Sequence, residues 1–89
     1  MAFQDDYSII LQPVVTESAF RLTEEQNKMI FIVNRRANKQ MIKEAFERLY
    51  RVKVTKINTA ITPKGEKRAI ITLSLDDSAL DLATQLGIF

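Results

Sequence analysis

The spacing of apolar residues first predicts two separate strands. In residues 28–33 (KMIFIV) the side chains that would point to either face of a strand are apolar. This is typical of a central strand covered on both faces. Residues 8–12 form a shorter extended segment that ends at Pro13, because proline biases the preceding residue away from helix.

A second pair of extended segments predicts a β-hairpin. Residues 52–61 are rich in β-branched side chains and alternate, and residues 67–75 alternate as a partner strand. Between them lie turn residues 62–66, in which Gly65 can take a positive φ. One face of the partner strand holds Ala69, Ile71, Leu73 and Leu75, and the other holds Arg68, Ile70, Thr72 and Ser74.

Helical spacing predicts three helices. Thr16 can cap the first, which fades near residues 25–27, and Asn38 can cap a second over residues 39–50. The last helix covers about residues 78–86. The apolar stripe of the second helix consists of Met41, Ile42, Ala45, Phe46, Leu49 and Tyr50, and its charged outer face consists of Lys39, Lys43, Glu44, Glu47 and Arg48.

This order of elements predicts an α+β fold. Two strands joined by helix 39–50 are most simply parallel with a right-handed crossover, and the last strand can insert antiparallel between them. The result is a ferredoxin-like split βαβ sandwich, with a mostly antiparallel sheet of three to four strands and helices packed on it. The apolar stripe covers one sheet face, and we expect the first and last helices to cover part of the other face or its edge. Residues 1–89 form one domain, and residues 1–7 are expected to be a flexible tail.

Composition narrows the class of protein. The chain has 89 residues, of which 46% are hydrophobic, enough for one buried core. It has no cysteine, which excludes disulfides and thiolate metal sites and fits a reducing compartment. No apolar run approaches the roughly 20 residues that span a bilayer, and the start has no basic region typical of a signal peptide. We therefore expect a soluble cytoplasmic protein.

The chain has few of the residues that commonly act in catalysis. Histidine and cysteine are both absent, which removes the commonest general base and the commonest strong nucleophile. The acidic pairs at 5–6, 24–25 and 76–77 are explained by a polar tail and by helix ends. Gly65 and Gly87 lie too far apart for a phosphate-binding loop. We predict no enzymatic activity, no cofactor, no metal site and no small-molecule substrate.

The net charge of +2 hides a strong segregation of charge along the chain. Residues 28–68 hold twelve basic and three acidic side chains, a net charge of +9, whereas the flanks carry a net charge of −7. Surface potential depends on where charges lie, so such a block can attract a polyanion although the whole chain is nearly neutral. Nucleic acid is therefore the first partner to consider.

Three sequence runs resemble a known family. They are Pro13-Val14-Val15-Thr16-Glu17, the segment from Asn38 to Glu47 (NKQMIKEAFE), and Val52-Lys53-Val54 followed by Ile57-Asn58-Thr59. Their order and separation are similar to those of the large-subunit ribosomal protein twenty-three family, and the likeness extends over roughly residues 10–89. The short turn at 62–66 and the ending Leu86-Gly87-Ile88-Phe89 are most similar to the archaeal form. Ser18 departs from the family, which usually has lysine there.

The resemblance implies a structural ribosomal protein. Family members bind large-subunit ribosomal RNA beside the exit of the peptide tunnel, next to other ribosomal proteins. They also dock factors that receive the nascent chain, such as the signal recognition particle, and Glu17 and Arg21 are the residues predicted to form that docking surface. The long hairpin arm of bacterial members is missing, because five turn residues cannot reach far, so no contact with the nascent peptide is expected.

The predicted RNA contacts lie in the basic block. Strand aromatics are few and Phe46 and Tyr50 belong to the helix stripe, so core packing explains them better than base stacking does. Binding through phosphate and shape is the expected mode, with Asn58 and Thr59 hydrogen bonding to sugar, phosphate or a base. The predicted RNA-binding residues are Arg35, Arg36, Asn38, Lys39, Lys43, Lys56, Asn58, Thr59, Lys64, Lys67 and Arg68.

A second class of function remains open. The same residues are compatible with a free-standing small α/β domain that regulates another protein through its sheet or helices. In that case the charged face of helix 39–50 is only solvated, and Asn58 and Thr59 lie on an exposed strand edge. The two hypotheses differ in their dependence on salt. A ribosomal subunit binds RNA tightly and loses affinity steeply with ionic strength, whereas a regulatory domain shows only weak non-specific attraction.

Overall fold

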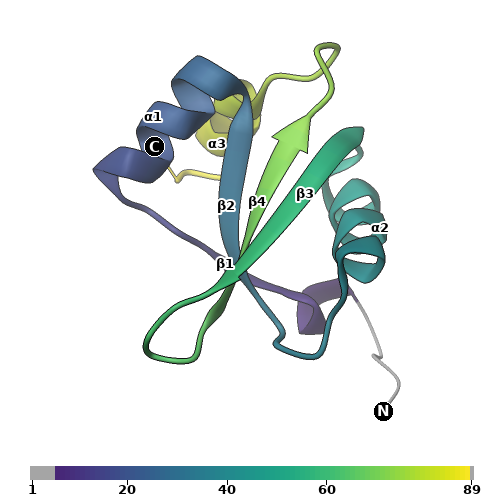
Figure 1. Cartoon of the computed structure of the whole chain (residues 1–89). Coiled ribbons are helices and arrows are strands. Elements are labelled where there is room, and N and C mark those ends of the chain that lie inside the picture. The colour runs from purple at the N-terminus through teal and green to yellow at the C-terminus, as the bar shows by residue number, and fades with distance from the viewer. Residues whose placement is uncertain (1–5, 89) are drawn as a thin grey trace.

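A computed structural model describes residues 6–88, which form a four-stranded sheet with helices packed around it (Figure 1). The elements in chain order are η1 (Asp6–Ser8), β1 (Ile10–Pro13), α1 (Glu17–Gln26), β2 (Lys28–Val33), α2 (Lys39–Tyr50), β3 (Val54–Ile61), β4 (Lys67–Leu73) and α3 (Ala79–Gln85). This order confirms the predicted alternation of strands and helices.

The sheet has the strand order β1-β2-β4-β3, and every pair of neighbours is antiparallel. Because β4 pairs with both β2 and β3, those two strands run parallel to each other with β4 inserted between them. The prediction of a split βαβ unit in an α+β fold is thus confirmed. Register places Phe31 opposite Ala69 and Ile57 opposite Ile71, so the apolar positions of all three strands meet on one face.

One face of the sheet forms the core together with α2 and α3. Alternate β2 residues Met29, Phe31 and Val33 are buried, and Ile42 and Phe46 of the α2 stripe are completely buried against them. The Phe31 and Phe46 rings meet edge to face with centroids 5.3 Å apart. The aromatic residues of the stripe therefore pack in the core, as predicted, rather than offering a stacking platform for bases.

The opposite sheet face has no buried residue on the long strands β2, β3 and β4. Its centre is formed by half-buried Ile30, Ile32 and Ile70. The expectation that the last helix covers this face or its edge is wrong, because the buried residues of α3 belong to the same core cluster as those of α2. The first and last helices lie together near the end of the sheet where β2 begins and β4 ends (Figure 1).

Helix ends are fixed by side chains, only some of which were predicted. The Thr16 and Asn38 side chains accept hydrogen bonds from the backbone amides of Ala19 and Met41, which confirms both predicted N-caps. The C-terminal ends of α1 and α2, at Gln26 and Tyr50, agree with the predictions. The residues that close them were not predicted, because Asn27 (φ 56°) and Arg51 (φ 55°), rather than glycine, adopt the left-handed conformation there.

The bounds of three strands and the extent of the tail differ from the predictions. β1 covers Ile10–Pro13 instead of residues 8–12. β4 ends at Leu73, and Leu75 is 99% exposed instead of facing the core, because β2 begins opposite Thr72 and offers no partner farther along. β3 begins at Val54, two residues later than expected. Of the tail expected over residues 1–7, residues 1–5 lie outside the described part, whereas Asp6 and Tyr7 belong to η1.

Candidate nucleic-acid interface

Two loops and the start of a helix bring basic residues together at one end of the molecule. The β2–α2 loop and the β3–β4 turn lie at the same end of the sheet, at the bottom of Figure 1. Arg35 Nη1 lies 3.7 Å from the point that a Cβ on Gly65 would occupy, and Lys67 Nζ donates a hydrogen bond to the Ala37 carbonyl at 2.7 Å. We call this region the basic end, and its residues are Arg35, Arg36, Asn38, Lys39, Lys64, Lys67 and Arg68.

The turn that carries Lys64 is short and tightly closed. The Thr62 amide donates to the Glu66 carbonyl and the Gly65 amide donates to the Thr62 carbonyl, both at 2.8 Å. Gly65 has φ 88°, a conformation that other residues rarely adopt, so its prediction as the turn glycine is confirmed. Lys64 is therefore held exposed beside the β2–α2 loop instead of lying on a mobile arm.

Some cations of the basic block already have partners within the protein. Arg48 donates hydrogen bonds from Nε and Nη2 to the Asp6 carboxylate, the shortest at 2.7 Å, which joins η1 to α2. The hydrogen bond from Arg48 lowers the pKa of Asp6 below its ordinary value. Arg68 Nη2 lies 3.8 Å from Glu66 Oε1, a looser pair. The charge free to meet a polyanion is therefore smaller than the sequence count of +9 indicates.

The two predicted lysines of α2 differ in exposure. Lys39 is exposed at the first turn of the helix, whereas Lys43, one turn later, is half-buried. The Asn38 side chain is occupied as the N-cap, although its amide nitrogen remains available to an acceptor. Glu47, expected on the charged outer face, instead accepts a hydrogen bond from the Val54 amide at 2.9 Å and joins α2 to β3.

The predicted contacts on β3 do not form one surface. Lys56 and Asn58 project from the sheet face opposite α2, where they lie across from Thr72 and Ile70. Thr59 projects from the other face, because successive strand residues point to opposite sides. The structure therefore separates Asn58 from Thr59, which were predicted to act together. Asn58 shares the open sheet face with Arg68, which lies across from Ala60.

The predicted docking residues lie on α1, remote from the basic end. Glu17 and Arg21 are one helical turn apart, and their side chains are 87% and 66% exposed with 3.5 Å between Oε1 and Nη2. Such an exposed pair is weak and leaves both groups available to a partner. α1 carries further exposed carboxylates, and we call the acidic end the set Glu17, Glu24 and Glu25.

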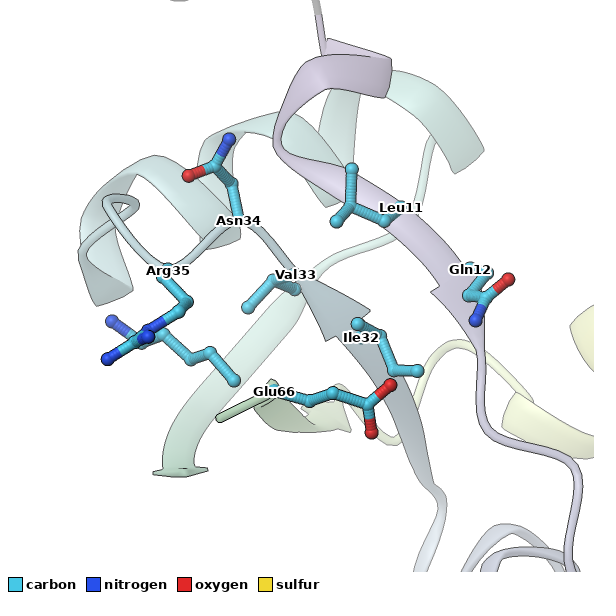
Figure 2. A pocket seen from close by; sticks show the side chains of 8 residues that line it. Leu11, Gln12, Ile32, Val33, Asn34, Arg35 and Glu66 are labelled. Carbon is cyan, nitrogen blue, oxygen red and sulfur yellow. The ribbon is translucent and has the colours of Figure 1, made fainter. Parts of the chain in front are cut away.

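An open groove of about 600 Å³ adjoins the basic end (Figure 2). Leu11 and Ile32 supply its apolar walls, and Arg35 and Glu66 lie at its edge. This groove was not predicted from the sequence, because Leu11 was assigned only to a strand and Ile32 only to a strand covered on both faces. The only local signal was an apolar residue next to Gln12 and Pro13 in a strand too short to bury it.

Two other kinds of feature are absent from residues 6–88. The described part holds no group of three potential metal ligands, and none of its helices is long and apolar enough to cross a bilayer. Fold and site together define a small α+β protein whose recognition features are charge and surface shape.

Comparison with known proteins identifies the family. The family model described as Ribosomal protein L23 matches residues 8–79. The chain is 51% identical over 80 residues to a large ribosomal subunit protein uL23 of Pyrobaculum aerophilum, which covers 90% of this chain and 99% of that protein. It is 42% identical over 85 residues to a protein of the same name from Methanothermobacter thermautotrophicus, covering 96% and 99% of the two chains. The chain therefore belongs to the Ribosomal protein L23 family, which confirms the predicted resemblance and the prediction that it is not an enzyme.

Proposed function

We propose that this protein is a structural component of the large ribosomal subunit that binds large-subunit ribosomal RNA through its basic end. The observation that supports this most strongly is that Arg35 and Lys39, around the start of α2, and Lys64, in the distant β3–β4 turn, are all exposed at one end of the sheet. Clustered cations displace counterions from phosphates, which makes such binding tight at low salt and strongly dependent on ionic strength.

The mode of binding follows from the site. The aromatic residues Phe31 and Phe46 are buried, so a stacking platform of the kind used on single strands is absent from the described sheet. Exposed lysine and arginine side chains on a rigid turn and a helix start suit the phosphates of folded RNA. Lys56 and Asn58 project from the open sheet face. They contact RNA only if the RNA also reaches that face.

The location and partners belong to the same proposal. The protein lies near the exit of the peptide tunnel in cytoplasmic ribosomes, beside neighbouring ribosomal proteins. Glu17 and Arg21 at the acidic end contribute to a surface that receives the signal recognition particle or another nascent-chain factor. Support comes from the distance between the ends of the molecule, because an acidic surface repels phosphate and is better suited to a basic protein segment.

Sedimentation of cell extracts tests the proposal. The protein should migrate with large subunits through a moderate-salt wash, and a variant with Arg35→Ala, Lys39→Ala and Lys64→Ala should be washed off at lower salt. A matched control removes the same charge elsewhere, with Arg21→Ala, Arg51→Ala and Lys53→Ala, and should remain bound. Wild-type protein found only in the soluble fraction would contradict the proposal and favour a free-standing regulatory domain.

A further inference from the structure

The apolar side chain of Leu11 is exposed instead of packing in the core. It lies at a β-bulge between Ile10 and Gln12, where the register of β1 against β2 shifts, and 52% of its surface is exposed. A bulge re-aims a side chain and is often found next to a functional site. Here it directs Leu11 to the groove that Ile32 lines from the neighbouring strand (Figure 2).

The groove combines apolar walls with polar edges. Leu11 and Ile32 are suited to the flat faces of a ring, whereas the Gln12 amide and the Glu66 carboxylate lie beside them (Figure 2). An amide both donates and accepts hydrogen bonds, and a carboxylate accepts them from an exocyclic amino group such as those of adenine, cytosine and guanine. A volume of about 600 Å³, open on one side, leaves room for a base and part of its sugar.

The charge at the edge of the groove favours a nucleotide over an apolar protein side chain. Arg35 is exposed there, and the Lys67 ammonium is held by the Ala37 carbonyl with two of its three N–H donors left for another acceptor. These cations suit the phosphate attached to a base. An inserted leucine or phenylalanine would use the walls but leave the cations unmatched.

We propose that this groove receives one unstacked base of the ribosomal RNA, with Leu11 and Ile32 against its faces and Arg35 and Lys67 at its phosphate. The inference rests on the proposed RNA-binding function and deepens it. Recognition of folded RNA typically uses such extruded bases at bulges and loops, because their edges are free. The basic end then supplies affinity, and the groove supplies selectivity for the position of one nucleotide.

Chemical probing of a large-subunit ribosomal RNA transcript tests this inference, with reagents that modify Watson–Crick edges for the bases and hydroxyl radicals for the backbone. Wild-type protein should protect one unpaired base that Leu11→Asp leaves reactive, while the backbone protections made by the basic end persist. Val15→Asp is the matched control, because Val15 is likewise exposed, at 57%, but lies outside the groove, and its footprint should equal that of the wild type.

Affinity and its salt dependence give a second readout. Leu11→Ala should weaken binding of the same transcript roughly fivefold without changing the log–log salt slope, because an apolar contact releases no counterion. Arg35→Ala should lower the slope by about 0.7 to 0.9.

Three results would overturn the inference. The first is an unchanged base footprint with Leu11→Asp. The second is a photoreactive residue at position 11 that crosslinks to a ribosomal protein, and not to RNA, in assembled subunits. In either case the proposed RNA-binding function would stand. The third is the absence of any wild-type footprint, which would contradict both proposals.

Discussion

At the scale of single residues, the Asn27 side chain connects several segments by hydrogen bonds. Its Nδ2 donates to the carbonyls of Ser74 and Asp77 at 3.1 and 2.9 Å, and its Oδ1 accepts from the Ala79 amide at 2.7 Å. Its left-handed backbone conformation ends α1 and turns the chain into β2. One residue therefore joins α1 to the β4–α3 loop and to the start of α3.

Two substitutions at Asn27 separate its hydrogen bonds from its backbone conformation. Asn27→Gly keeps the positive φ but removes the side-chain partners, and should lower the free energy of unfolding by about 1 to 3 kcal/mol. Asn27→Ala should cost about 1 kcal/mol more, because alanine is strained in that conformation. Urea melts of both variants measure this difference. Melts equal to that of the wild type would show that these hydrogen bonds contribute nothing to stability.

The Asp6–Arg48 pair gives stability a defined dependence on pH. Because the pKa of Asp6 is lowered in the folded protein, its contribution is fully present above the ordinary aspartate pKa of about 4 and is lost as pH falls through the lowered value. Wild type should therefore be more stable than Asp6→Asn at pH 6, and the difference should shrink as the pH falls below the ordinary aspartate pKa of about 4. Denaturant melts at several pH values measure it. A difference that does not change with pH would rule out this ion pair as its source.

At the scale of elements, the sequence correctly predicted features that depend on residues close together in the chain. The α2 stripe, its Asn38 cap and the Gly65 turn are all correct, because spacing and capping act within a few residues. The positions that were wrong depend on distant partners: Leu75 is exposed because β2 begins too late to pair with it, and Glu47 binds the backbone of β3. The groove at Leu11 likewise requires β1 and β2 to be placed side by side.

Helix α2 connects the core to the basic end, and its two faces should respond differently to mutation. Phe46→Ala should lower the free energy of unfolding by about 3 to 5 kcal/mol, since Phe46 is completely buried against Phe31 and Tyr50. Lys39→Ala, on the exposed first turn, should change it by less than about 0.5 kcal/mol. Denaturant melts of both variants measure the contrast, and equal effects would contradict the orientation of α2.

At the scale of the whole molecule, the fold converts segregation along the chain into two charged ends. The basic end combines the β2–α2 loop, the start of α2 and the hairpin turn, whereas α1 carries the acidic end (Figure 1). The sequence indicated the two signs of charge but not their positions. The net charge of residues 28–68 also includes Arg48, although in the structure Arg48 is paired with Asp6.

Charge reversal at the acidic end tests the docking part of the proposal. Ribosomes that carry Glu17→Lys should assemble normally but recruit the signal recognition particle more slowly at low salt, because an exposed charge mainly steers association. Stopped-flow association kinetics at two salt concentrations measure the effect. Glu44→Lys, the same charge reversal at an exposed position on α2, is the matched control. Unchanged kinetics would remove Glu17 from the docking surface, and failure to assemble would show that this end contacts RNA.

The salt dependence of binding to a large-subunit ribosomal RNA transcript tests the assignment of the RNA-binding surface. The triple variant of Arg35, Lys39 and Lys64 to alanine should lower the slope of log affinity against log salt by about 2 to 3, since each lost phosphate contact removes about 0.7 to 0.9. The control triple at Arg21, Arg51 and Lys53, which removes the same charge, should leave the slope nearly unchanged. Equal losses of slope in the two triple variants would show that net charge, and not the basic end, determines binding.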